Sequence, residues 1–97
     1  MPGYICYYKW TQQGIKDIKG APDRIKQAKA AAEKAGIRLV GVWITFGRYD
    51  MVSVVDAPDD YTTASMALWM GSLGNVTTET VRALSEDEFA QVVQRLP

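Results

Sequence analysis

Two apolar, β-branched segments at residues 38–44 and 51–55 are separated by a six-residue polar loop at residues 45–50. Short runs rich in valine and isoleucine favour β-strands, and a short loop containing glycine favours an antiparallel connection between them. The middle of the chain is therefore predicted to be a β-hairpin, and every other element has to be arranged around it.

The segments on both sides of the hairpin alternate between strand and helix patterns. Further strands are predicted at residues 4–10 and 75–84. Two main helices are expected, one from residue 23 to 35 and one from residue 60 to 73, with stops at Gly36 and Gly74. The predicted caps are Thr11 for a short helical turn, Asp59 for the second main helix, and the Ser85–Glu88 capping box for a final helix.

The resulting order is β-α-β-β-α-β-α, and its first six elements match the ferredoxin-like split βαβ pattern. We therefore expect an α+β fold with a four-stranded antiparallel sheet, a ferredoxin-like βαββαβ unit and an added C-terminal helix. The length predicts that residues 1–97 form a single domain. The helix at 60–73 is apolar most of the way round, which is typical of a helix buried on two sides.

Both faces of the predicted strands carry apolar side chains, and this indicates self-association. Two helices can cover only one face of a four-stranded sheet, and monomers rarely leave a large apolar patch in water. We therefore expect the second face to pack against another copy, giving a homodimer or higher homo-oligomer built as a dimeric α/β barrel. In the first strand the two alternating sets are Tyr4, Cys6, Tyr8 and Trp10 against Ile5 and Tyr7.

The chain contains no histidine, and this absence excludes several kinds of chemistry. Histidine is the commonest metal ligand and the usual general base at neutral pH, so Ser-His-Asp and Cys-His catalysis are ruled out. We expect no metal and no cofactor. The 11 basic and 11 acidic residues balance, which argues against a nucleic-acid partner.

The distribution of apolar residues and cysteine predicts a cytoplasmic protein. No apolar run is long enough to span a bilayer, so no membrane partner is expected, and the N-terminus lacks the basic leader of a signal peptide. A single cysteine, Cys6, leaves no internal disulfide.

The hairpin loop concentrates polar functional groups and is the first candidate site. Arg48 could bind a carboxylate or phosphate, while Tyr49 or Asp50 could donate or accept a proton. The alternative is turn chemistry, in which Gly47 supplies a positive φ and Asp50 bonds to nearby backbone N–H groups or to Arg48. On the catalytic hypothesis all three of Arg48, Tyr49 and Asp50 point into a cavity.

Aromatic residues form the second candidate site. For the group as a whole, a pocket between sheet and helices could hold a planar, largely apolar molecule, although packing in a core or dimer interface is the better explanation for each residue taken singly. Glu79 in the fourth strand would be a candidate base if it faced inward. The predicted ligand-binding residues are Trp43, Tyr7, Tyr8, Trp10 and Glu79.

Nearly the whole chain resembles the GYD-domain family within the dimeric α/β-barrel superfamily. The motifs that carry the resemblance lie at residues 11–16, 47–50, 57–60 and 74–80. The family's name tripeptide corresponds to Gly47, Tyr49 and Asp50, with Arg48 inserted after the glycine. The family has no settled activity, so the resemblance implies the fold and the dimeric assembly rather than a reaction. Superfamily relatives include cofactor-independent monooxygenases, small isomerases and cyclases.

The sequence leaves two function classes open. The first is a small homo-oligomeric barrel protein that binds a small, largely apolar molecule, with metal-free isomerisation, cyclisation or cofactor-independent oxygenation as the reactions that remain. The second is a non-catalytic module that senses a ligand or assembles with itself. The sequence does not decide whether the protein is an enzyme.

Overall fold

The computed structural model describes residues 1–97 and contains one four-stranded antiparallel sheet. The strand order is β2-β3-β1-β4, as the split βαβ pattern requires. This arrangement confirms the predicted α+β, ferredoxin-like fold. The strands are β1 (Gly3–Trp10), β2 (Arg38–Ile44), β3 (Met51–Asp56) and β4 (Val76–Ala83).

Four α-helices and one 3-10 turn complete the fold. Each main helix begins and ends within two residues of its predicted position, and Pro22 occupies the first turn of α2, where its missing N–H costs nothing. The helices are α1 (Gln12–Lys16), α2 (Ala21–Lys34), α3 (Asp60–Ser72) and α4 (Glu86–Gln94), with the 3-10 turn η1 at Ile18–Gly20.

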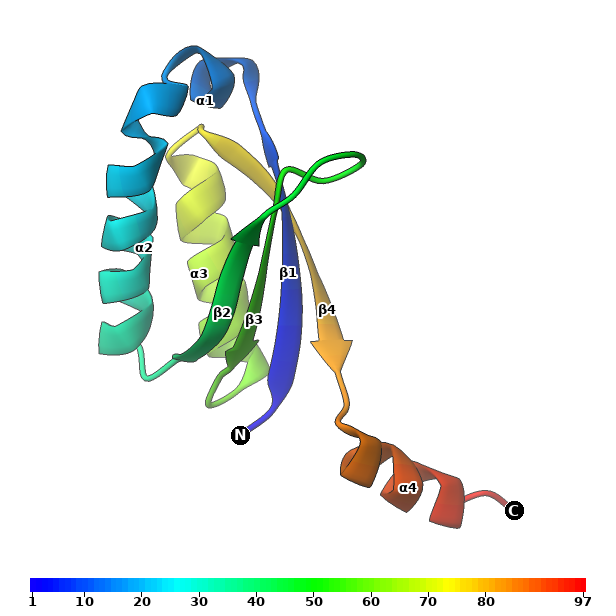
Figure 1. Ribbon diagram of the computed structural model, residues 1–97. Helices are drawn as coiled ribbons and strands as arrows, with labels where there is room; N and C mark the ends of the chain where they lie inside the picture. The colour runs from blue at the N-terminus through cyan, green and yellow to red at the C-terminus, as the bar shows by residue number, and fades with distance from the viewer.

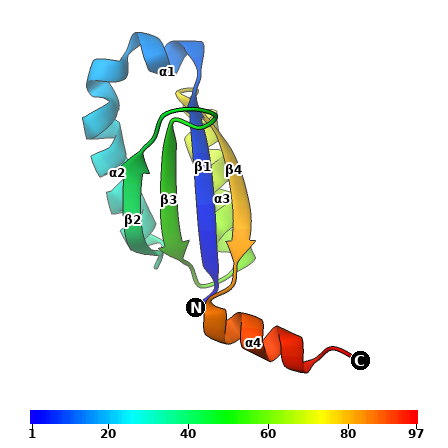
Figure 2. The same cartoon turned by 45° about the vertical axis from the view of Figure 1, so that its right-hand side comes forward.

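The two long helices lie on the same side of the sheet. Figures 1 and 2 show α2 and α3 stacked against one face, while the opposite face carries no helix and is crossed only near one end by the loop between β2 and β3. Helix α4 leaves the end of β4 and projects away from α2 and α3. The fold therefore has two layers, one uncovered sheet face and one protruding helix. None of its helices has the length and hydrophobicity that a bilayer crossing requires.

The helix ends follow from local side-chain chemistry. The side chain of Asp59 caps α3 by accepting the Thr62 N–H at 2.8 Å, and this hydrogen bond lowers the pKa of Asp59. Ser85 and Glu88 form the predicted capping box of α4, and the Ser85 N–H lowers the pKa of Glu88. After α2 and α3 the chain turns at Gly36 and Gly74, whose φ angles are +79° and +85°.

The core is small and lies between the sheet and the two long helices. Strand alternation points Tyr4, Cys6 and Tyr8 of β1 toward the helices, where they pack with residues such as Met51 and Val55. Only 11 of the 97 residues are buried. The accessible surface is 6895 Å², whereas a compact monomer of this mass exposes roughly 5,500 Å². The chain alone therefore leaves an unusual amount of surface in water.

Helix α3 does not have the environment that its composition predicts. Its inner side packs on the sheet, with Thr63 buried and Met66 against the core. Its outer side is uncovered, and the side chains of Tyr61 and Leu68 are 88% and 76% exposed. The expected burial on two sides was wrong for the single chain, because no second layer covers this helix.

A tight junction joins the end of β1 to the turn between α3 and β4. The Thr11 hydroxyl donates to the Gly74 carbonyl at 2.6 Å, and the Thr11 N–H donates to the Asn75 carbonyl at 3.1 Å. The Gln13 side chain donates to the Leu73 carbonyl at 3.1 Å. Gly14 lies so close that a Cβ at this position would be 2.0 Å from the Asn75 carbonyl oxygen. Two of the motifs that carry the family resemblance, 11–16 and 74–80, therefore meet here in space.

Candidate functional site

The hairpin loop between β2 and β3 is closed by its own hydrogen bonds. The Thr45 N–H donates to the Asp50 carbonyl at 2.9 Å, and the Thr45 hydroxyl donates to the Tyr49 carbonyl at 2.7 Å. Gly47 has a φ of +111°, a conformation that favours glycine. Phe46 at the tip is 99% exposed. The glycine thus has the turn role that the sequence offered as the alternative to catalysis.

Asp50 is bonded to the backbone of the neighbouring strand. Its N–H donates to the Tyr8 carbonyl at 2.8 Å, and its carboxylate accepts the Trp10 N–H at 2.8 Å. These two bonds extend the pairing of β1 with β3 beyond the last regular ladder position. They anchor the loop to the sheet, which agrees with the alternative in which Asp50 bonds to nearby backbone N–H groups.

Tyr49 makes side-chain contacts on the uncovered face of the sheet. Its ring lies 4.7 Å from the Tyr7 ring, centroid to centroid, and its hydroxyl donates to the carboxylate of Glu79. The Arg48 guanidinium lies 5.8 Å from the Tyr49 ring centroid. The hydrogen bond to Glu79 raises the pKa of Tyr49, and the phenol is protonated at neutral pH, as an ordinary tyrosine is.

Strand register explains why these residues meet. Tyr7 pairs with Glu79 on β4 and with Val52 on β3, and Val52 pairs with Trp43 on β2. Directly paired residues of antiparallel strands point to the same face. The ring of Trp43 lies against Gly41, where an added Cβ would be 2.5 Å from the indole. The uncovered face therefore brings together five predicted residues: Tyr7, Trp43, Arg48, Tyr49 and Glu79.

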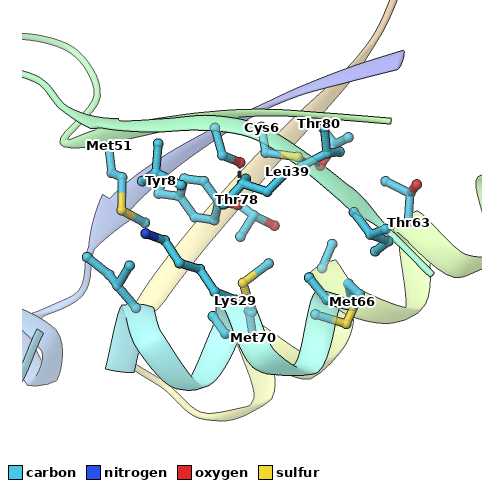
Figure 3. A pocket seen from close by; sticks show the side chains of 18 residues that line it. Cys6, Tyr8, Lys29, Leu39, Met51, Thr63, Met66, Met70, Thr78 and Thr80 are labelled. Atoms are coloured by element: carbon cyan, nitrogen blue, oxygen red, sulfur yellow. Dashed lines mark hydrogen bonds between the residues drawn. The ribbon is translucent and has the colours of Figure 1, made fainter. Parts of the chain in front are cut away.

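The other two predicted aromatic residues, Tyr8 and Trp10, lie on the opposite face. Tyr8 lines an apolar cavity between the sheet, α2 and α3, and Figure 3 shows it among Cys6, Met51 and Met70. The volume of this cavity is about 90 Å³. A second cavity, lined by Trp10 and Trp69 among others, measures about 260 Å³. Both are below the roughly 300–1,000 Å³ of ordinary small-molecule sites.

The predicted residues are thus divided between two environments. The set on the uncovered face combines a protonated phenol, a carboxylate and a guanidinium, which can hydrogen-bond and bind charge but are not enclosed. The set on the covered face lines small apolar cavities. No three cysteine, aspartate or glutamate side chains gather in a way that could hold a metal ion.

The Tyr8 hydroxyl is a buried polar group in the apolar core. It shares a hydrogen bond of 2.9 Å with the Ser53 hydroxyl. Burial raises the pKa of Tyr8 to about 12, because the low-polarity surroundings disfavour the phenolate. The proton on Tyr8 is therefore part of what keeps the chain folded at high pH.

This raised pKa predicts alkaline sensitivity. Tyr8 contributes roughly 2–3 kcal/mol to the free energy of unfolding because its pKa is higher in the folded than in the unfolded chain. This contribution is complete below the unfolded-state pKa near 10 and is lost as the pH rises through about 12. Urea unfolding from pH 8 to 11.5 should show this fall in wild type and a shallower fall in Tyr8→Phe. Equal pH slopes in the two proteins would contradict the assignment.

Sequence reasoning missed two surfaces. One is the outer side of α3, for which the all-round apolar pattern was a signal but was taken to mean burial. The other is the α4 stripe, which consists of Phe89, Val92 and Val93 on α4 and Leu96 two residues beyond its end. The sequence pattern was interpreted only as the apolar side of an amphipathic helix. All four side chains of the stripe are at least 45% exposed.

Comparison with known proteins gave two matches. A family model described as "GYD domain" matches residues 4–93. A protein of Thermus thermophilus named "Glutamine synthetase and cystathionine beta-lyase binding protein" is 35% identical over 97 residues, covering 99% of each chain. No solved structure gave a significant match.

Proposed function

Because this chain belongs to the GYD domain family, we propose that it is a non-catalytic protein-binding module that pairs with itself and docks on an enzyme. The Thermus relative supports this proposal, since its name describes binding to two metabolic enzymes and the alignment covers almost the whole of both chains. By this similarity, glutamine synthetase and cystathionine β-lyase are the enzyme partners we propose for this chain.

The observation that carries the proposal is the uncovered apolar outer side of α3. Tyr61 and Leu68 are seven residues apart, so they lie on the same side of the helix and point into water. Tyrosine is enriched at protein interfaces because it offers a large contact area with a polar tip. We assign enzyme docking to this surface because it is exposed to water and stays free when the uncovered sheet face is covered.

Pairing of two copies through the uncovered sheet face is the second part of the proposal. The accessible surface of 6895 Å² exceeds the roughly 5,500 Å² of a compact monomer by about 1,400 Å². A standard interface removes about 800 Å² from each partner. The excess is therefore large enough for a stable dimer. The equal numbers of acidic and basic residues add no net repulsion between copies.

Small-molecule binding is a second candidate function, favoured by the gathering of Tyr7, Tyr49 and Glu79 on that same face. Two paired sheets would enclose these groups, whereas the two apolar cavities between the sheet and the helices are small. Native mass spectrometry of the dimer decides the point. A retained metabolite supports this role, and a dimer of bare polypeptide mass from freshly purified protein speaks against it.

Enzyme docking predicts that Leu68→Glu weakens binding. Biolayer interferometry with immobilised glutamine synthetase and cystathionine β-lyase from the same organism should detect wild-type binding to at least one enzyme. A charge at the centre of the apolar surface is expected to reduce affinity at least about tenfold. The matched control is Ala30→Glu, which adds the same charge to an exposed position on α2.

Two results would count against this function. One is the absence of binding to both enzymes at about 50 µM, a concentration that detects weak, transient interfaces. The other is an equal loss of enzyme affinity in Leu68→Glu and Ala30→Glu, which would indicate a general effect of the added charge. Circular dichroism of both variants should match wild type, because each substituted side chain is exposed.

A further inference from the structure

Helix α4 is well formed locally but lacks packing within its own chain. It has nine residues, a complete capping box and an acidic first turn. Its one ion pair joins Arg82 to Glu88 at 3.7 Å, next to the strand from which it starts. An isolated helix of this length is marginal in water even with good caps, because helix stability in proteins comes mainly from packing an apolar face. A stable α4 therefore requires a surface to pack on.

The α4 stripe is the face that needs cover. Phe89, Val92 and Val93 follow the helical spacing i, i+3 and i+4, and Leu96 lies two residues beyond the end of the helix. The exposed fractions are 60% for Phe89, 45% for Val92 and Val93, and 67% for Leu96. No element of the same chain lies over them (Figure 1). Four neighbouring apolar side chains form the kind of contiguous patch that marks an interaction site.

The direction of α4 indicates which surface it meets. Figure 1 shows α2 and α3 on one side of the sheet and α4 projecting toward the other, the side of the uncovered face. The link from β4 is short, with Leu84 and Ser85 between strand and helix. The radius of gyration is 14.8 Å, against about 12.5 Å for a compact chain of this length. Helix α4 and the uncovered sheet face therefore lie at an angle to each other, and the space between them is open to water.

From these observations we infer that α4 is an arm that packs its stripe on a second copy of the chain. This inference rests on the pairing proposed above and extends it. A second copy seated on the uncovered face comes within reach of the projecting helix. By two-fold symmetry, the helix of the second copy reaches back in the same way. The surface excess of about 1,400 Å² is more than the roughly 800 Å² of a standard interface, which leaves area for the arm as well as the sheet.

The test compares two faces of the same helix. Phe89→Gln combined with Val93→Gln replaces two of the four apolar side chains of the stripe by a residue that favours helix, and Ala90→Gln places the same residue outside the stripe. Sedimentation equilibrium should show a dimer dissociation constant raised at least about tenfold for the stripe variant and unchanged for Ala90→Gln. Equal affinities in all three proteins would overturn the arm assignment while leaving the sheet-face pairing intact. A wild-type chain that stays monomeric would overturn both.

Hydrogen exchange separates packing on a second copy from packing on the same chain. The α4 amides should be protected in the wild-type dimer and should exchange rapidly on dilution into the monomer. Protection that does not depend on protein concentration would show that α4 folds back on its own chain, and would overturn the inference. Enzyme binding through Leu68 is measured separately, so its success or failure does not alter either outcome.

Discussion

A Gly14→Ala variant is expected to lose about 3 kcal/mol of unfolding free energy, while Gly71→Ala gains about 0.5–1 kcal/mol. The same methyl group is added to a helical glycine in both cases. At Gly14 the new Cβ would be 2.0 Å from the Asn75 carbonyl oxygen, whereas at Gly71 nothing lies within 4 Å. The sign of the effect is therefore set by the surroundings of each glycine.

The loss at Gly14 has a structural cause that cannot be relieved by a side-chain rotation. The contact is with backbone, so either α1 or the turn before β4 has to move. Movement breaks the hydrogen bonds of Thr11 to the Gly74 and Asn75 carbonyls, at 2.6 and 3.1 Å. Gly71→Ala, by contrast, replaces a flexible residue by the best helix former at an exposed position.

Thermal unfolding at one protein concentration measures both variants. The expected fall for Gly14→Ala is about 15 °C or more, because 1 kcal/mol corresponds to roughly 4–8 °C in a domain of this size. If both variants shifted the melting temperature in the same direction, the close packing against Asn75 would not explain why position 14 requires glycine.

The sequence predicted the elements well because each has a local signal. The valine-rich runs around the hairpin, the caps at Asp59 and Ser85, and the glycines at 36 and 74 all act through neighbouring residues. These signals located all four strands and the two main helices within two residues. The observed difference at α2, which starts at Ala21 instead of residue 23, reflects Pro22 being accepted in the first turn.

The candidate site was harder to predict because it depends on strand register. Tyr7 and Tyr8 are adjacent and equally aromatic, so the sequence could not tell which of them faces the helices. The contact between Tyr49 and Glu79 joins residues 30 positions apart and follows from the pairing of Tyr7 with Glu79. The sequence therefore grouped Tyr8 and Trp10 with Tyr7 and Trp43, whereas the structure separates these pairs by the thickness of the sheet.

The uncovered face and the outer side of α3 are physically distinct surfaces, and this permits two independent functions. Helix α3 lies behind the sheet when the uncovered face is viewed from the front (Figure 2). A substitution on one surface should leave the other unaffected, since additivity holds for sites that share no contacts. Leu68→Glu is therefore expected to spare dimerisation, and a change at the uncovered face is expected to affect the dimer first.

Trp43→Glu is expected to convert the proposed dimer to monomer at micromolar concentration, with a dissociation constant raised at least about 100-fold. The Trp43 indole lies against Gly41 in β2, and Trp43 is 52% exposed in the single chain. In the dimer this indole would be covered by the second sheet. Tryptophan is among the residues that contribute most to interfaces, and a buried unpaired carboxylate is costly.

The control for this prediction is Trp43→Phe, which keeps an aromatic ring on the same face and should weaken the dimer far less. Sedimentation equilibrium gives the dissociation constants, and far-ultraviolet circular dichroism checks that both variants fold. Because the indole is half exposed in the single chain, the Glu variant should remain folded as a monomer. A Trp43→Glu dimer as tight as wild type would show that the two copies do not meet through this face. The aromatic patch of Tyr7, Trp43 and Tyr49 would then have to be explained by a different partner.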